Sequence, residues 1–317
     1  MTARRRAMVT GGAGFIGSTI VDRLLGRGWD VLAIDVFEPF YPRAQKERNL
    51  VAARRSSRFR LTEVDTMDFG SLQREAVAFG PDTIFDFAAR AGVRPSIADP
   101  TLYIDINARG LQHTLSVATD IGARVILSSS SSIYGNDTER PYKEDQAKGR
   151  PESPYGATKI AAEALAYAHH ATTGLPVGVA RLFTVYGPRQ RPDLAIHHFA
   201  TRMLRGEEVE LYDSGRGVRD YTYVDDVVEA FIRLADAPHP WLLVNIGSHA
   251  PISTIEVVRE LERALGVAAK TVDRPRQLGD VDVTYADISR ARAELGWRPK
   301  TPFGEGIDRF CAWLRAG

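Results

Sequence analysis

Short apolar runs alternate with amphipathic stretches along the first 185 residues of the chain. The runs lie at residues 8–10, 30–34, 59–64, 83–87 and 124–127. The stretches between them, near 43–55, 68–79 and 100–121, have polar and apolar positions spaced as in helices. Largely apolar strands that alternate with helices indicate a parallel sheet covered on both faces. Ligands bind such sheets at the carboxyl ends of the strands, so the loops after these runs are the informative ones.

The second half of the chain predicts a smaller lobe. We expect a long helix over 153–173, then a helix over 194–206 and a strand over 209–212. The segment 222–247 contains a helix and an apolar strand that we expect to rejoin the sheet. The remaining helices are expected near 253–265, 287–295 and 303–315. The lobes therefore interleave: residues 1–185, rejoined by about 222–250, form the sheet domain, and residues 186–221 and 251–317 form the smaller lobe.

The first apolar run ends in closely spaced glycines, Gly11, Gly14 and Gly17, and a helical pattern follows at once. Glycines allow a tight turn, and the free N–H groups at a helix start favour a pyrophosphate. Asp35 ends the next run, where an acidic side chain can accept the adenosine-ribose hydroxyls and repel a 2′-phosphate. The glycines alone also fit an ordinary strand–helix turn, but with Asp35 they favour a doubly wound α/β Rossmann sheet that binds NAD rather than NADP.

Composition narrows the class of protein. The 317 residues are 44% hydrophobic and 26% charged, with a formal net charge of +1, so no global field attracts nucleic acid or an anionic membrane. The sole cysteine, Cys311, allows no intramolecular disulfide and no thiolate metal cluster. Residues 4–6 are arginines before an apolar run, but glycines interrupt that run at once, and no run reaches membrane-spanning length. We expect a cytoplasmic protein without a metal.

Two further stretches carry candidate chemistry. Residues 128–132 place five serines directly after an expected strand, where a serine run is unlike a linker. Downstream, Tyr155 and Lys159 are spaced to share one face of a helix. An ammonium group close to a phenol stabilises the phenolate, which can then exchange a proton with a substrate hydroxyl. A tyrosine and a lysine at this spacing are by themselves typical of a solvated helix face, but the glycine turn, Asp35 and the serines favour the catalytic interpretation.

With these residues, the sequence resembles the extended short-chain dehydrogenases/reductases, in the branch of nucleotide-sugar epimerases. The resemblance covers nearly the whole chain and rests on residues 11–17, Ala88-Ala89, Tyr155-x-x-x-Lys159 and residues 219–226. It implies that Ser130 is the catalytic hydroxyl, Tyr155 the acid/base, and Lys159 the residue that holds the nicotinamide ribose and stabilises the tyrosinate. It implies NAD contacts from Gly11, Gly14, Phe15, Ile16, Gly17, Asp35, Asp65, Thr66, Ala88, Ala89, Asn107, Ser128, Tyr155, Lys159 and Phe183.

The same resemblance implies that the smaller lobe binds a UDP-sugar. Tyr212 corresponds to a contact of the uracil, Arg219 to one of the pyrophosphate and Asp280 to one of the uridine ribose. The full set of implied substrate residues is Arg94, Ser131, Ser132, Thr184, Arg189, Arg191, Tyr212, Arg219 and Asp280. Leu278 departs from the related pattern, which often has proline before Gly-Asp.

Residues 91–96, 182–188 and 191–193 look most like those of UDP-glucuronate 4-epimerases. Hydroxyls of Ser131, Ser132 and Thr184, with Arg189 or Arg191 nearby, could hold a C6 carboxylate through charge-assisted hydrogen bonds. Each arginine fits a solvated loop residue equally well. Dehydratases and decarboxylases of this branch have acidic residues where this chain has serines, so epimerisation without elimination or loss of carbon dioxide is favoured.

The implied reaction is transient oxidation at C4, rotation of the 4-keto sugar, and return of the hydride to the other face. Two alternatives remain open: a UDP-glucose or UDP-N-acetylglucosamine 4-epimerase, and a non-catalytic NAD(P)-sensing Rossmann protein. The tyrosine–lysine pair counts against the sensor. The resemblance also implies a homodimer through the helices over 100–121 and 153–173, the second of which is rich in alanine. Alanine could equally be present there as a good helix former.

Overall fold

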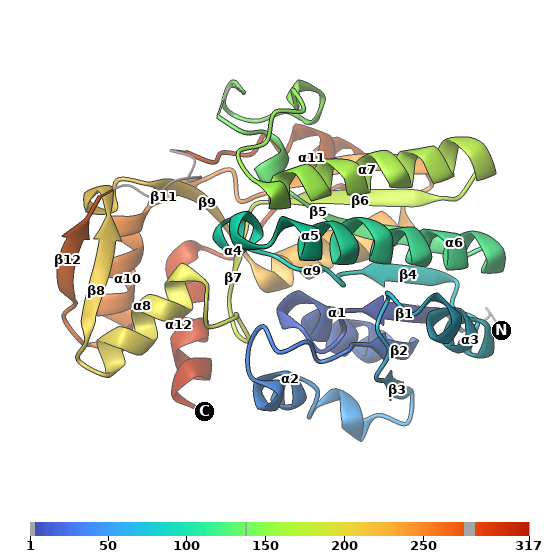
Figure 1. Ribbon diagram of the computed structural model, residues 1–317. Helices are drawn as coiled ribbons and strands as arrows, with labels where there is room; N and C mark the ends of the chain where they lie inside the picture. Colours follow the sequence, from blue (N-terminus) through green and yellow to red (C-terminus); the bar gives the residue numbers. More distant parts are fainter. Residues whose placement is uncertain (1–3, 137, 276–282, 317) are drawn as a thin grey trace.

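A seven-stranded parallel sheet forms the centre of the molecule in the computed structural model (Figure 1), which describes residues 4–136, 138–275 and 283–316. In spatial order its strands are β10 (Trp241–Ile246), β6 (Val177–Leu182), β5 (Arg124–Ser130), β4 (Thr83–Asp86), β1 (Arg6–Thr10), β2 (Asp30–Ile34) and β3 (Phe59–Thr62). The order reverses at β1, where β4 lies on one side and β2 on the other. Such a reversal opens a crevice for a ligand at the carboxyl ends of the strands.

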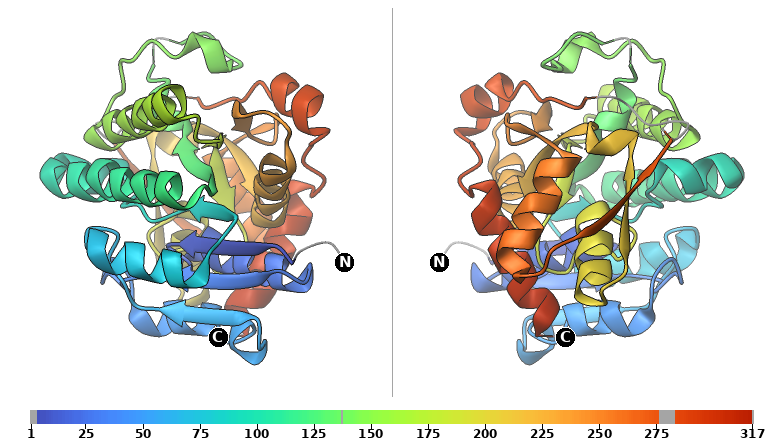
Figure 2. Two further views of the ribbon diagram at one scale, coloured as in Figure 1. Left: turned by 90° about the vertical axis from the view of Figure 1, so that its right-hand side faces the viewer. Right: turned by 90° about the vertical axis from the view of Figure 1, so that its left-hand side faces the viewer.

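Helices cover both faces of the sheet, as the left view of Figure 2 shows. One face packs against α3 (Phe69–Phe79), α6 (Leu111–Ile121) and α7 (Pro154–Thr173). The other packs against α1 (Phe15–Gly26), α9 (Val224–Asp236) and α11 (Ser289–Leu295). Because both faces are covered, the strands are apolar and buried along most of their length. The predicted α/β fold with a doubly wound parallel sheet is confirmed.

The C-terminal lobe lies at the left in Figure 1 and has its own small sheets. Strands β8 (Glu208–Tyr212) and β12 (Lys270–Arg274) pair in parallel, beside helices α8 (Ala195–Leu204), α10 (Thr254–Leu265) and α12 (Phe303–Arg315). A second sheet, made of β7 (Thr184–Tyr186), β9 (Val218–Tyr223) and β11 (Pro251–Ser253), stands between this lobe and the main sheet. Between β9 and β11 in the sequence, α9 and β10 return to the main sheet, where β10 pairs with β6.

The helix expected over 100–121 is interrupted. It consists of α5 (Pro100–Ile104), a π-helical segment (Asp105–Gly110) and α6. The π-helical segment buries Asn107, whose amide holds the loop after β4. Two further short helices stand near the carboxyl ends of the strands, α2 (Arg43–Asn49) and α4 (Val93–Ala98). None of the helices in the described part of the chain is long and apolar enough to cross a membrane.

Candidate active site

A cavity of about 320 Å³ lies at the carboxyl ends of the strands, at the crevice that the strand order predicts. Its walls come from the loops after β1 to β6 and from the first turns of α7. Most of the predicted cofactor residues line it: Gly11, Gly14, Phe15, Ile16, Gly17, Asp35, Asp65, Thr66, Ala88, Ala89, Ser128, Tyr155, Lys159 and Phe183. Asn107 is buried behind this wall.

The glycine turn after β1 has the geometry that a pyrophosphate site needs. Gly11 has a φ of +63°, and a Cβ on Gly17 would overlap the carbonyl oxygen of Gly11, so side chains are excluded at both positions. Helix α1 begins directly after Gly14, and no side chain caps its first N–H groups. Backbone donors at an uncapped helix start favour an anion, so the turn fits the pyrophosphate of NAD.

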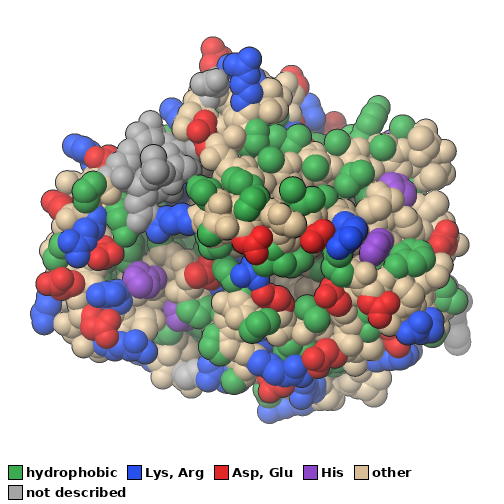
Figure 3. All heavy atoms as spheres, in the orientation of Figure 1, with side chains coloured by type: hydrophobic (Ala, Val, Ile, Leu, Met, Phe, Trp, Pro, Cys, Tyr) green, Lys and Arg blue, Asp and Glu red, His purple; other side chains and the backbone are tan. Residues whose placement is uncertain are grey.

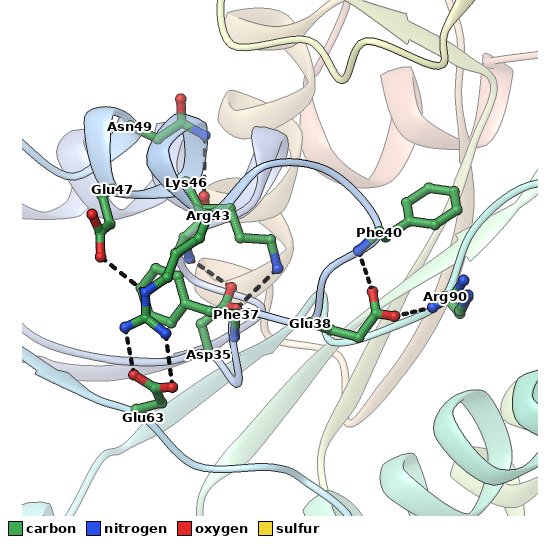
Figure 4. Close-up of polar contacts among 11 residues, drawn as sticks. Asp35, Phe37, Glu38, Phe40, Arg43, Lys46, Glu47, Asn49, Glu63 and Arg90 are labelled. Atoms are coloured by element: carbon green, nitrogen blue, oxygen red, sulfur yellow. Dashed lines mark hydrogen bonds and ion pairs between the residues drawn. The ribbon is translucent and has the colours of Figure 1, made fainter.

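Asp35, at the end of β2, forms the polar wall next to this turn (Figure 4). Its carboxylate accepts the N–H groups of Ala13 at 3.0 Å and Phe37 at 2.7 Å, which fixes its orientation. The ammonium group of Lys46, on α2, donates to the same carboxylate at 3.2 Å, and both side chains are buried. The carboxylate therefore fits the predicted ribose contact, but it already has a cationic partner that the sequence did not indicate.

The loops after β3 and β4 continue the cofactor wall. Asp65 and Thr66 line the cavity after β3. After β4, the side chain of Asn107 accepts the N–H of Arg90 at 2.7 Å and donates to its carbonyl at 2.9 Å. The same amide donates to the hydroxyl of Thr158 on α7, at 3.0 Å. Asn107 therefore fixes the loop of Arg90 against α7 instead of lining the cavity itself.

The three predicted catalytic residues, Ser130, Tyr155 and Lys159, line one region of the cavity. The Lys159 ammonium donates to the carbonyl of Ser128 at 2.9 Å and lies 6.0 Å from the centre of the Tyr155 ring. Helix α7 presents both side chains on one face, and the hydroxyl of Ser153 caps its start by accepting the N–H of Gly156 at 3.1 Å. A phenol, an ammonium and a hydroxyl gathered in one cavity are groups that can exchange a proton with a hydroxyl of a ligand.

Glu163 continues the same face of α7 one turn further on and was not predicted from the sequence. Its carboxylate binds the guanidinium of Arg181, on β6, through two hydrogen bonds of 2.9 and 2.8 Å. It also accepts the hydroxyl proton of Ser129, next to Ser130. Glu163 and Arg181 therefore tie α7 to the ends of β5 and β6.

Of the two arginines considered for a substrate carboxylate, Arg191 lines the cavity and Arg189 lies elsewhere. Arg191 is held by two hydrogen bonds to Asp193, at 2.9 and 2.7 Å, and lies 5.1 Å from the centre of the Phe40 ring. Arg189 forms an ion pair with Asp22 on α1, at 2.5 Å, and lines a separate hollow between α1 and the start of α9. The placement of Arg189 therefore does not fit the predicted carboxylate contact.

The other predicted substrate residues lie beside the cavity or toward the smaller lobe. Ser131, Ser132 and Thr184 are chain neighbours of the lining residues Ser130 and Phe183, and the N–H of Ser132 donates to the Ser130 hydroxyl at 3.2 Å. The Arg94 guanidinium lies 5.3 Å from the centre of the Tyr212 ring, which brings residues far apart in sequence together. Arg219 lies on β9. Asp280 and Leu278 lie outside the described residues.

Several lining residues were missed because they come from the aromatic loop after β2. Glu38 forms an ion pair with Arg90 across the cavity wall, and the N–H of Phe40 donates to the same carboxylate at 2.9 Å (Figure 4). Tyr41 and Lys46 line the cavity deeper in the same segment. The only signal in the sequence was the density of aromatic and proline residues over 36–42, which indicated a loop but gave no direction to its side chains.

The doubly wound sheet, the glycine turn and the tyrosine–lysine pair together define a dinucleotide-dependent α/β enzyme. Residues 7–247 match the NAD dependent epimerase/dehydratase family, and the chain belongs to that family. A UDP-glucuronate 4-epimerase of Thermodesulfobacterium geofontis (strain OPF15) is 36% identical over 310 residues, which cover 97% of this chain and 95% of that protein.

Solved structures agree over the whole chain. A UDP-glucuronic acid 4-epimerase from Bacillus cereus, in complex with UDP-glucuronic acid and NAD, matches with a TM-score of 0.91 and 30% identity, covering 98% of this chain and 99% of that one. A UDP-glucose 4-epimerase from Thermotoga maritima, with UDP-glucose, matches with a TM-score of 0.91 and 31% identity over the same shares. The cofactor of this chain is NAD, and the donors around the cavity fit it. The backbone fold does not separate the two sugars, so the distinction depends on side chains.

Proposed function

We propose that this chain catalyses the NAD-dependent C4 epimerisation of a UDP-sugar, with UDP-glucuronate and UDP-galacturonate as its substrate and product. The position of Arg191 is the observation that favours a uronate over a neutral sugar as the substrate. Its guanidinium lines the same cavity as Tyr155, Ser130 and Lys159. A guanidinium held in a fixed orientation binds a carboxylate through two parallel hydrogen bonds, which a neutral hydroxymethyl group cannot match.

In this proposal, NAD would be held by the glycine turn and Asp35, and when bound it would supply the reversible hydride acceptor for C4 of the sugar. Tyr155 takes the proton of the C4 hydroxyl and gives it back in the second half of the reaction. Ser130 donates a hydrogen bond to the same oxygen. Lys159, anchored on the carbonyl of Ser128, stabilises the tyrosinate. Glucuronate oxidised at C4 is a β-keto acid, which can lose carbon dioxide. Holding its carboxylate out of alignment with the C4 carbonyl would limit this decarboxylation.

The experiment compares progress curves on UDP-glucuronate and UDP-glucose. The wild type should prefer the uronate about a hundredfold or more, because the donors built for a carboxylate remain unpaired with the neutral sugar. Arg191→Met and Thr184→Val should each reduce the rate on UDP-glucuronate more than the rate on UDP-glucose. Arg189→Met is the matched control, since Arg189 pairs with Asp22 outside the cavity, and it should leave the ratio unchanged. Equal wild-type rates on both sugars would instead identify a neutral-sugar epimerase.

We also propose a homodimer formed through the layer of α4, α5 and α7. Large apolar side chains are exposed there: Ile97, Ile104 and Tyr167 are 51%, 56% and 55% exposed. Figure 3 shows apolar side chains gathered over this part of the surface, between charged residues of both signs. Exposed apolar groups rimmed by polar ones are typical of a protein interface. The cytoplasmic location expected from the sequence remains a prediction, to be checked by cell fractionation.

A further inference from the structure

The hydroxyl of Tyr41 is a buried polar group without a hydrogen-bond partner among the described residues. Tyr41 lines the cavity and is 8% exposed, so bulk water does not replace the missing partner. Burial, with a smaller contribution from the charge of Asp35, raises the pKa of its phenol far above the ordinary value, so the hydroxyl keeps its proton and remains a donor. A buried donor without an acceptor is costly for a protein to keep, which points to an acceptor supplied by a ligand.

The position of this hydroxyl indicates which acceptor that is. A Cβ placed on Gly14 would lie 3.9 Å from the Tyr41 oxygen, so the hydroxyl stands opposite the glycine turn. That turn carries the uncapped N–H groups at the start of α1. Both sets of donors face the same space, and an anionic oxygen between them satisfies both. The phosphate oxygens of a dinucleotide are such a group.

The loop that carries Tyr41 is held in place independently of the hydroxyl. The backbone of Phe37, which precedes it, has a φ of +53° and is fixed by its N–H bond to Asp35. On the other side, the amide of Asn49 donates to the carbonyl of Ala13 at 3.1 Å and ties α2 to the glycine turn (Figure 4). The phenol is therefore directed at the turn by its surroundings, and its orientation does not depend on a hydrogen bond of its own.

Lys46 lies between the ring of Tyr41 and the carboxylate of Asp35 and interacts with both. Its ammonium lies 5.3 Å from the centre of the Tyr41 ring and donates to Asp35 at 3.2 Å. The charges of Lys46 and Asp35 balance, so the carboxylate that faces the ribose does not repel an anion at the neighbouring turn. An ammonium has three N–H groups, and Asp35 accepts one of them.

We propose that the Tyr41 hydroxyl is a ligand of the cofactor pyrophosphate, donating a hydrogen bond to a phosphate oxygen held over the glycine turn. Lys46 is the positioning residue that balances Asp35 and packs on the ring of Tyr41. The proposal does not depend on which sugar the enzyme uses, because these residues act on NAD.

The test is Tyr41→Phe, which removes only the hydroxyl. Full-length protein is stripped of nucleotide, and its thermal stability and its Kd for NAD are measured by scanning and titration calorimetry. The nucleotide-free variant should be as stable as the wild type or more so, because it no longer buries an unpaired donor. Its Kd for NAD should rise about tenfold, as one charge-assisted hydrogen bond is lost. The fraction of protein that retains NAD through purification should fall accordingly.

Tyr186→Phe is the matched control. Tyr186 is also buried, but its hydroxyl donates to the carbonyl of Phe303 at 3.1 Å, away from the cavity. This variant should lose stability and keep the wild-type Kd for NAD. Lys46→Met should lose both stability and affinity for NAD, because it removes the partner of Asp35. An unchanged Kd for NAD in Tyr41→Phe overturns the proposal. A fall in nucleotide-free stability like that of Tyr186→Phe overturns it too, since the hydroxyl would then have its partner within the protein.

Discussion

At the scale of single residues, the meaning of Asp35 changes once its neighbours are known. From the sequence, an acidic residue after the second strand accepts ribose hydroxyls and repels a 2′-phosphate. The structure adds Lys46, whose ammonium lies 3.2 Å from that carboxylate inside the cavity wall. The negative charge that is expected to repel a 2′-phosphate therefore lies directly beside a positive charge.

The first prediction follows from this pair. In Asp35→Asn the repelling charge is gone and the ammonium of Lys46 is left to bind a 2′-phosphate, so affinity for NADP should rise relative to NAD by about tenfold or more. Titration calorimetry with both dinucleotides measures the ratio. The double variant Asp35→Asn, Lys46→Met is the control, and it should not show the increased affinity for NADP relative to NAD. An NADP affinity that stays at the wild-type level in Asp35→Asn would show that Lys46 does not reach the phosphate.

Asp86 is a second residue whose surroundings set its behaviour. It ends β4, is 4% exposed, and accepts the hydroxyl proton of Thr10 at 2.7 Å. Burial raises the pKa of its carboxyl, against the opposing effects of the Thr10 hydrogen bond and the charge of Lys159. A carboxyl whose pKa is higher in the folded state binds its proton more tightly there, so its stabilising effect is full below the ordinary value and is lost as the pH rises through the raised one.

We therefore expect Asp86→Asn to gain stability relative to the wild type as the pH rises. The amide keeps the size of the side chain and cannot ionise, so the cost of a buried charge is absent at every pH. Urea unfolding at about pH 4, near the ordinary pKa of aspartate, and again near neutrality measures the free-energy difference between the two proteins. A difference that is the same at both pH values would contradict the raised pKa.

At the scale of elements, a buried ion pair joins α7, the helix that carries Tyr155 and Lys159, to the main sheet. Glu163 and Arg181 have side chains that are 11% and 7% exposed, and they join α7 to β6. Arg181 also donates to the hydroxyl of Tyr134 at 2.9 Å and to the carbonyl of Glu144 at 2.6 Å. The helix that carries Tyr155 and Lys159 therefore has a defined rotation relative to the strand that carries Ser130.

Glu163→Gln tests this link. The variant leaves the Arg181 charge buried without its counter-charge, which should reduce the free energy of unfolding by about 3–5 kcal/mol. Because Ser129 is held by the same carboxylate, kcat should fall while KM for the sugar changes little. The control is Glu305→Gln, which breaks an exposed ion pair with Arg309 on α12 and should cost less than about 1 kcal/mol. Equal losses in the two variants would show that the buried pair does not hold the helix.

The comparison of expected and observed elements shows what periodicity can and cannot establish. The sequence predicted α3 over 68–79, and the helix is Phe69–Phe79, because a local apolar pattern and its cap determine it. The helix expected over 100–121 contains a π-helical segment, because the buried amide of Asn107 must reach the loop after β4, and that contact is not local. Strands β6 and β7 were both missed; β7 has only three residues and follows β6 after a single residue.

In the candidate site, too, the sequence predicted the residues that belong to local motifs and missed those that are placed by contacts between distant segments. Residues within a motif, such as Gly11, Tyr155 and Lys159, were placed by their spacing, and the structure brings them to one cavity. Tyr41, Lys46 and Glu163 were missed because nothing in the local sequence says which way a loop or a polar helix turns its side chains. The distinction between Arg189 and Arg191 was open for the same reason, since an ion pair with Asp22 on a distant helix draws Arg189 away.

At the scale of the whole molecule, the exposed layer of α4, α5 and α7 is continuous with the active site. Helix α7 carries Tyr155 on its inner face, and the backbone N–H of Tyr155 donates to the hydroxyl of Ser96 on α4, at 3.1 Å. Ile97 and Ile104 are exposed on α4 and α5 of the same layer. A partner chain seated on this layer would therefore support the helix that carries Tyr155.

The last prediction is that this layer forms the homodimer and that dimer formation and turnover are linked. Ile104→Glu places a charge in the apolar contact, whose burial without a partner is unfavourable, so the protein should sediment as a monomer at micromolar concentration where the wild type is a dimer. Its kcat should fall as α7 loses support. Leu204→Glu, at an apolar side chain of α8 that is 43% exposed, is the control and should leave both properties unchanged. A wild-type monomer would exclude the dimer, and a dimer that survives Ile104→Glu would place the interface on another face.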